Sequence, residues 1–172
     1  MNSKLIWITG LSGAGKSTIA KEVYSRLKQS LSNTVMIDGD AFREVIGNDL
    51  KHTLDDRIKN AYRIVKMCKY LYNQDINVIC ATMSLYQEIH EFIYDNFEDP
   101  LIVYLDVSMA ELKKRNQKGL YSSGTNVTGI DLPFDEPSHT DFVLKTKNED
   151  NLKNTVSLIL ERCKINDNNE AR

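Results

Sequence analysis

Short apolar runs alternate with longer segments of helical periodicity along most of the chain. The runs lack polar alternation, which predicts strands that are buried on both faces of a sheet. They occupy residues 5–9, 35–38, 76–81 and 101–105, with a weaker fifth run at 142–144. Because helical segments separate these strands, the order predicts an α/β fold with a five-stranded parallel sheet covered by helices on both faces.

Apolar positions recur every three or four residues between the runs, which predicts amphipathic helices. The predicted helices cover residues 16–31, 53–72 and 85–94, a short stretch after Ser108, and a last segment capped by Asn148. Thr53 and Ser108 each precede an acidic residue by three positions, as in the capping boxes that begin helices.

One stretch fits neither pattern. Residues 119–137 are rich in Gly, Ser, Thr, Asp and Pro, and a long irregular segment in a compact domain is typical of a lid or a binding loop. We therefore expect one domain over residues 1–172, with a mobile lid at about 113–137 and a frayed tail at 166–172.

Composition narrows the class of protein. The 172 residues carry 22 basic and 24 acidic side chains, a net charge of −2, which argues against electrostatic binding to nucleic acid. No apolar run approaches the roughly 18–20 residues of a membrane helix. Three cysteines without C-x-x-C spacing predict reduced, mostly buried thiols in a cytoplasmic protein. His90 and His139 are isolated, and we expect both in surface or loop positions.

The strongest motif follows the first strand. Residues 10–18 read GLSGAGKST, which matches a phosphate-binding loop. The residues predicted to hold ATP are Gly10, Leu11, Ser12, Gly13, Ala14, Gly15, Lys16, Ser17 and Thr18. Glycines let backbone N–H groups point at phosphate oxygens, and the helix N-terminus adds partial positive charge. Lys16 would reach the β- and γ-phosphates, and the Ser17 hydroxyl would bind Mg²⁺.

A pair of carboxylates marks the end of the second strand. The strings Asn-Lys-x-Asp and Asp-x-x-Gly of GTPases are absent, so a small-molecule kinase is favoured. Asp38 and Asp40, at alternate positions, are expected to face the cleft at the carboxyl edge of the sheet. One would bind Mg²⁺ or its waters, the other would accept a proton from an attacking hydroxyl, and Arg43 would hold an anionic acceptor.

The chain resembles the adenylyl-sulfate kinase family over most of its length. Six motifs carry the resemblance in family order: GLSGAGKST, IDGDAFR, DDRIKNAYRI, MSLY, QKGLY and VTGIDLPFDEP. The family uses ATP and Mg²⁺ to phosphorylate the ribose 3′-hydroxyl of an activated nucleotide. The resemblance implies a nucleoside-monophosphate-kinase type of fold and a homodimer.

The resemblance also implies roles for particular residues. Asp40 would face the acceptor hydroxyl, and Asp38 would lie near the metal. Ser84 matches a serine proposed as a phosphoserine intermediate, although direct in-line transfer needs none. Arg115 matches an arginine of the lid helix near ATP. The residues matched to the acceptor side and the lid are Arg43, Arg57, Asn60, Lys118 and Leu120.

The acceptor half departs from the family pattern. Two phenylalanines that clasp adenine in adenylyl-sulfate kinases are replaced by His52 and Val127, which weakens a stacking clamp for a bicyclic base. The lid is shorter, and Tyr62 and Gln87 stand where the family often has arginine.

These departures favour an acceptor other than adenylyl sulfate. A pyrimidine nucleotide with a phosphoramidate group fits a reduced clamp, and the chain resembles the cytidine diphosphoramidate kinases of bacterial capsule modification within the same family. An adenylyl-sulfate kinase with a divergent base pocket and a nucleotide-dependent regulatory protein are the alternatives.

Overall fold

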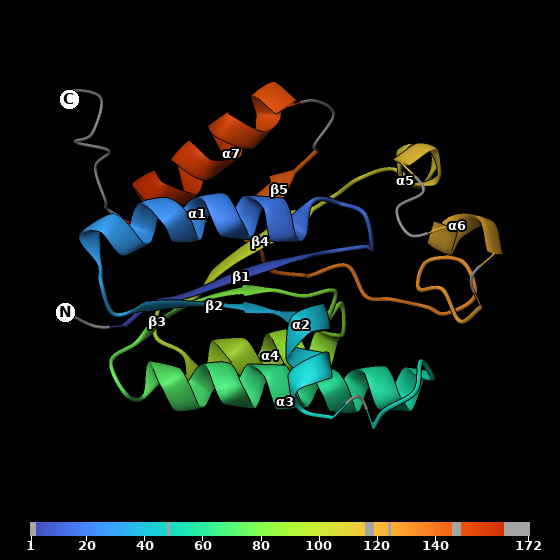
Figure 1. Ribbon diagram of the computed structural model, residues 1–172, viewed down its shortest axis with the longest axis horizontal. Helices are drawn as coiled ribbons and strands as arrows, with labels where there is room; N and C mark the ends of the chain where they lie inside the picture. Colours follow the sequence, from blue (N-terminus) through green and yellow to red (C-terminus); the bar gives the residue numbers. More distant parts are fainter. Residues whose placement is uncertain (1–2, 48, 116–118, 124, 146–148, 164–172) are drawn as a thin grey trace.

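The computed structural model describes residues 3–47, 49–115, 119–123, 125–145 and 149–163. Within them, five parallel strands form one sheet in the order β2-β3-β1-β4-β5 (Figure 1). The strands are β1 (Leu5–Gly10), β2 (Thr34–Asp38), β3 (Asn77–Ala81), β4 (Leu101–Leu105) and β5 (Phe142–Leu144). The predicted fold class is confirmed.

Helices cover both faces of the sheet. α1 (Lys16–Ser30) and α7 (Glu149–Arg162) lie on one face, and α3 (Leu54–Tyr72) and α4 (Gln87–Asn96) lie on the other (Figure 1). Successive residues of β1 enter different cores: Ile6 and Ile8 pack towards α1, whereas Leu5 and Trp7 pack towards α3 and α4. Burial on both faces is the reason why the strand reads as a continuous apolar run.

The order of the strands creates the crevice that holds the site. β1 lies in the sheet between β3 and β4, so the chain turns to opposite sides after β1 and after β3. Open parallel sheets bind ligands at the carboxyl ends of their strands at such a reversal. Around this edge lie α2 (Gly39–Val45), α5 (Met109–Arg115) and α6 (Leu120–Ser123).

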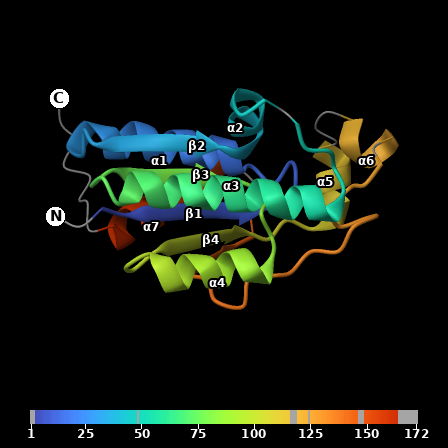
Figure 2. The ribbon, with the colours of Figure 1, turned by 90° about the horizontal axis from the view of Figure 1, so that it is seen from below.

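The view in Figure 2 places α3 between two neighbours. α2 lies on one side of α3 and α4 on the other, at the face of the sheet opposite α1 (Figures 1 and 2). α3 therefore has two flanks at the carboxyl edge, one towards α2 and one towards α4.

Helix starts were predicted well where a side chain caps them. Thr53 accepts a hydrogen bond from the backbone N–H of Asp56, and Ser108 accepts one from that of Glu111. α4 begins at Gln87, two residues later than expected, because Tyr86, the residue that caps it, is extended. α2 was not predicted. The residues of the Asn148 cap and of the 166–172 tail lie outside the described residues.

Two further expectations concern single side chains. His90 was expected at the surface, and this is wrong: it is 4% exposed on the inner side of α4. Cys68, Cys80 and Cys163 are all buried and free, as predicted. None of the helices among the described residues has the length and apolarity needed to cross a bilayer.

Candidate active site

The loop from Gly10 to Lys16 has the shape of an anion cradle. Gly15 caps α1 with a φ of 102°, a left-handed conformation that favours glycine. Gly10 approaches β4 so closely that a Cβ there would lie 2.8 Å from the carbonyl oxygen of Leu105. The Lys16 ammonium donates to the carbonyl of Leu11 at 2.9 Å. The 15-residue helix α1 thus starts at the loop with its N–H groups directed at it.

Asp38 joins this loop to α2. One carboxylate oxygen accepts the backbone N–H of Asp40 at 3.0 Å, and so caps α2, while the other accepts the Ser17 hydroxyl at 2.5 Å. The two residues predicted to bind Mg²⁺ are therefore in contact, although 21 positions separate them in sequence. A hydroxyl and a carboxylate at a phosphate loop fit a magnesium ion, which prefers oxygen ligands.

Asp40 lies in the first turn of α2, a helix that the sequence did not predict. Its carboxylate is exposed to solvent. Burial lowers the pKa values of both His52 and Arg57, and the negative charge of Asp40 acts in the opposite direction on both. An exposed carboxylate held by a capped helix start is suited to accept a proton.

The start of α2 packs tightly against the end of β3. Gly39 is buried, and a Cβ there would lie 2.9 Å from Oγ1 of Thr82. The Thr82 hydroxyl in turn lies 2.9 Å from that of Ser84, which is 6% exposed. Ser84 is therefore near the carboxylate pair, with its hydroxyl in a buried contact. Burial lowers the pKa of His90, and the negative charge of Asp135 and a backbone hydrogen bond with Ser84 oppose this.

Two arginines organise the loop before α3. Arg43 donates to the carbonyls of Leu50 and Lys51, and its guanidinium lies 3.4 Å from Nδ1 of His52. Arg57 donates to the carbonyl of His52 at 3.2 Å and to that of Asn126 at 3.0 Å. Arg57 therefore ties the α3 start to the segment after α6.

The residues at the start of α3 have altered pKa values and a buried polar atom. Burial, then Arg43 and Arg57, lower the pKa of His52, so its ring is neutral at pH 7. Burial is also the largest cause of the lowered pKa of Arg57. The side-chain oxygen of Asn60 is buried and has no hydrogen-bond partner among the described residues. A buried acceptor of this kind is suited to a donor supplied by a ligand.

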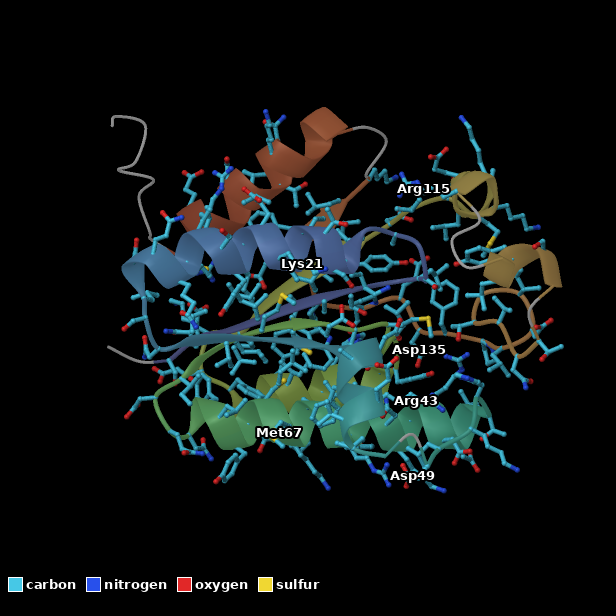
Figure 3. The ribbon with its side chains drawn as sticks, viewed as in Figure 1. Lys21, Arg43, Asp49, Met67, Arg115 and Asp135 are labelled. Atoms are coloured by element: carbon cyan, nitrogen blue, oxygen red, sulfur yellow. The ribbon has the colours of Figure 1, made fainter. Side chains whose placement is uncertain are left out.

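The segment predicted to form the lid contacts the phosphate loop. The Tyr121 hydroxyl donates to the carbonyl of Ser12 at 2.6 Å, and Arg115 donates to that of Gly13 at 3.3 Å. Leu120 is half-buried in α6, and Lys118 lies outside the described residues. Arg115 is thus placed at the donor site, on the side where the strands end (Figure 3).

Val127 is closed off from the cleft. Its side chain is 2% exposed, its backbone N–H donates to the Asp131 carboxylate at 2.9 Å, and its carbonyl accepts from residues 130–132. A side chain buried in this way offers no face to a base. The clamp position occupied by Val127 is therefore filled by the protein itself.

The sequence reasoning missed Thr82, Tyr121, His90 and the Asn126 carbonyl. Tyr121 follows Leu120 in the QKGLY motif, so an aromatic hydroxyl beside a lid residue was the available signal. The other three carry no local signal, since their contacts join segments that are far apart in the chain.

Comparison with known proteins agrees with this geometry. Residues 2–145 match the Adenylylsulphate kinase family. A cytidine diphosphoramidate kinase of Campylobacter jejuni is 35% identical over 169 residues, which cover 95% of this chain and 98% of that protein. An adenylyl-sulfate kinase of Clostridium kluyveri is 34% identical over 172 residues, which cover 95% and 86%.

A solved structure shares the fold over most of this chain. The Mycobacterium tuberculosis APS kinase CysC, in complex with AMPPNP and APS, superposes with a TM-score of 0.83 at 26% identity, covering 95% of this chain and 98% of that one. The predicted fold class and the predicted phosphotransferase class are confirmed by these relatives. The match over 144 residues and the two relatives of nearly full length show that this chain is a member of the adenylylsulphate kinase family.

Proposed function

We propose that the protein transfers the γ-phosphoryl group of ATP to the ribose 3′-hydroxyl of cytidine diphosphoramidate. The observation that carries the transfer is the contact of Ser17 with Asp38, because it fixes the phosphate loop against the helix that bears Asp40. The relative that covers nearly the full length of both chains supports the choice of acceptor.

The donor side is formed by the phosphate loop. Backbone N–H groups and Lys16 hold the β- and γ-phosphates, which requires the Lys16 ammonium to leave the Leu11 carbonyl. Ser17 and Asp38 would hold Mg²⁺, which neutralises charge on the phosphate oxygens when it is bound. Arg115, already at the carbonyl of Gly13, adds a cation at the same loop.

The acceptor side supplies the nucleophile. Asp40 accepts the proton of the 3′-hydroxyl while the hydroxyl oxygen forms a bond to the γ-phosphorus. At the same time the bond between that phosphorus and the bridging oxygen of ADP breaks. Arg43 and Arg57 hold the anionic end of the acceptor, with Asn60 beside Arg57 on the same helix. Ser84, buried against Thr82, orders the loop beside the acceptor and needs no covalent intermediate.

The acceptor base separates the two candidate substrates. In this chain Val127 is buried and His52 carries one small ring, so the two phenyl faces that clasp adenine in the family are reduced to one imidazole. We infer that the pyrimidine acceptor is preferred over adenylyl sulfate. A role in capsule modification and a homodimeric state follow from the resemblance and belong to the same proposal.

Steady-state ADP release tests the acceptor. Cytidine diphosphoramidate and adenylyl sulfate are offered separately, with Mg²⁺ present, and we expect a higher kcat/KM for the cytidine acceptor. A higher value for adenylyl sulfate would make the chain an adenylyl-sulfate kinase. No turnover of either, with normal ATP binding, would favour the regulatory alternative.

Asp40→Asn tests the proton acceptor. We expect kcat to fall by about a hundredfold or more, because a positioned general base contributes that much, while the Kd of ATP stays nearly unchanged. Glu44→Gln, which removes an exposed carboxylate from the same helix, is the matched control and should keep kcat. Equal activity of the two variants would show that Asp40 is not the base.

A further inference from the structure

A pocket lies on the flank of α3 that faces α4, away from α2. Its volume is about 500 Å³, within the range of about 300–1,000 Å³ that small-molecule sites occupy. Leu54 and Ile58 of α3 line one wall, Tyr86 lines another, and Phe134 of the predicted lid segment contributes a half-buried ring. We call this cavity the α3–α4 pocket.

Carboxylates form its polar rim. Glu88 and Glu91 of α4 line the pocket, as does Asp135 opposite them. Glu88 accepts the Tyr62 hydroxyl at 2.8 Å, and Glu91 accepts the side-chain amide of Gln87 at 2.8 Å. Each contact involves one oxygen of a carboxylate that can accept several hydrogen bonds. The rim therefore favours groups that donate hydrogen bonds.

Two hydrogen bonds of Asp135 fix its position at the pocket. Its carboxylate accepts the backbone N–H of Gln87 at 3.0 Å, and its own N–H donates to the carbonyl of Leu85 at 3.0 Å. The C-terminal end of the predicted lid segment is thereby tied to the start of α4. Asp135 lies on the same side of the molecule as Arg43, where the strands end (Figure 3).

Arg57 connects the pocket with the acceptor cleft. It directly precedes Ile58 on α3, and its guanidinium donates to the carbonyls of His52 and Asn126 on the acceptor side. Burial raises the pKa of Tyr86, and the positive charge of Arg57 opposes this. Neighbouring positions of α3 thus carry an arginine of the proposed acceptor site and an apolar residue that lines the pocket.

We propose that the α3–α4 pocket receives the cytosine base of the acceptor nucleotide, with Glu88 and Glu91 accepting hydrogen bonds from its exocyclic amine. This assignment rests on the proposed function. Carboxylates are the side chains that read the amine of cytosine in other contexts, and aromatic rings offer stacking to any base. The carboxylates disfavour the phosphate end by like-charge repulsion, so that end stays with Arg43 and Arg57.

Uracil fits the rim poorly. It presents a carbonyl where cytosine presents an amine, so the lone pairs of that carbonyl would face the lone pairs of the glutamate carboxylates. The buried side chain of Val127 removes the competing stacking position in the lid. The pocket should therefore distinguish cytidine from uridine acceptors rather than merely accept a pyrimidine.

The test compares acceptors that differ in this one group. Wild-type protein should show a kcat/KM for cytidine diphosphoramidate about tenfold or more above that for uridine diphosphoramidate. In the double variant Glu88→Gln/Glu91→Gln the ratio should fall towards one, mainly through KM. A glutamine amide can accept a hydrogen bond from the amine of cytosine or donate one to the carbonyl of uracil, so it does not distinguish the two bases. Asp95→Asn, which removes a carboxylate of α4 outside the pocket, should keep the wild-type ratio.

Binding separates this proposal from the transfer reaction itself. The Kd values of CMP and UMP, measured by calorimetry on the same three proteins, need no turnover. Preference for CMP that the double variant loses and Asp95→Asn keeps supports the base pocket even if neither diphosphoramidate is phosphorylated. Equal binding of CMP and UMP by the wild type, or an unchanged preference in a folded double variant, overturns it.

Discussion

Gly39→Ala is the sharpest test of how the carboxylate pair is held. The new Cβ would lie 2.9 Å from Oγ1 and 3.1 Å from Cβ of Thr82, and 3.4 Å from the carbonyl oxygen of Ala81. Carbon contacts are most favourable at about 3.5–4.0 Å, so the start of α2 and the end of β3 must separate by roughly 0.5 Å. This movement displaces Asp38 and Asp40 together.

The effects on stability and on activity have different sizes. Overpacking costs about 1–3 kcal/mol, whereas alanine in place of a helical glycine gains about 0.5–1 kcal/mol. The net loss of at most about 2.5 kcal/mol lowers Tm by roughly 5–10 °C in a protein of this size. Because misplacing reacting groups by about 1 Å can cost a hundredfold, we expect kcat to fall about tenfold or more.

The assay is ADP release at a temperature where the variant is folded by circular dichroism, with ATP varied separately. Ala41→Gly, at an exposed position of the same helix, is the matched control, because it lowers stability by about 1 kcal/mol without a steric contact. Its kcat should stay near wild type. Full kcat in folded Gly39→Ala would refute the reasoning that close packing at Thr82 positions the pair.

Two further predictions concern the lid and the buried histidine. Tyr121→Phe removes the hydroxyl that donates to Ser12; since one hydrogen bond contributes about 0.5–1.5 kcal/mol, KM for ATP should rise about two- to tenfold, and an unchanged ATP titration would contradict a role in shaping the loop. Burial lowers the pKa of His90 from its ordinary value of 6.5, so its neutral ring stabilises the fold above that pH and the contribution is lost as pH falls below it. The decline of Tm below about pH 6.5 should be shallower in His90→Gln than in wild type or in His139→Gln. Equal slopes of Tm against pH in the three proteins would exclude His90 as a cause of this decline.

The phosphate loop of the candidate site could be predicted from the sequence more completely than the residues around Asp38 and Asp40. The phosphate loop is contiguous in sequence, and its glycines are needed for local backbone reasons, so residues 10–18 could be assigned before the fold was known. Asp38 and Asp40 were also found, but α2 was missed because its first residue is a glycine that elsewhere favours turns. His90 was misplaced because a histidine gives no sign of which helix face it occupies.

The sequence by itself determined the class of fold, because the periodicity of strands and helices is local. It also singled out the donor loop through a contiguous motif and the candidate acceptor residues through the family resemblance. Only the tertiary structure decided that Ser17 meets Asp38, that Arg57 holds the Asn126 carbonyl and that Val127 is buried. It also created the α3–α4 pocket from three separate segments. Such contacts join residues far apart in the chain, and their geometry follows from how the helices and the lid pack on the sheet.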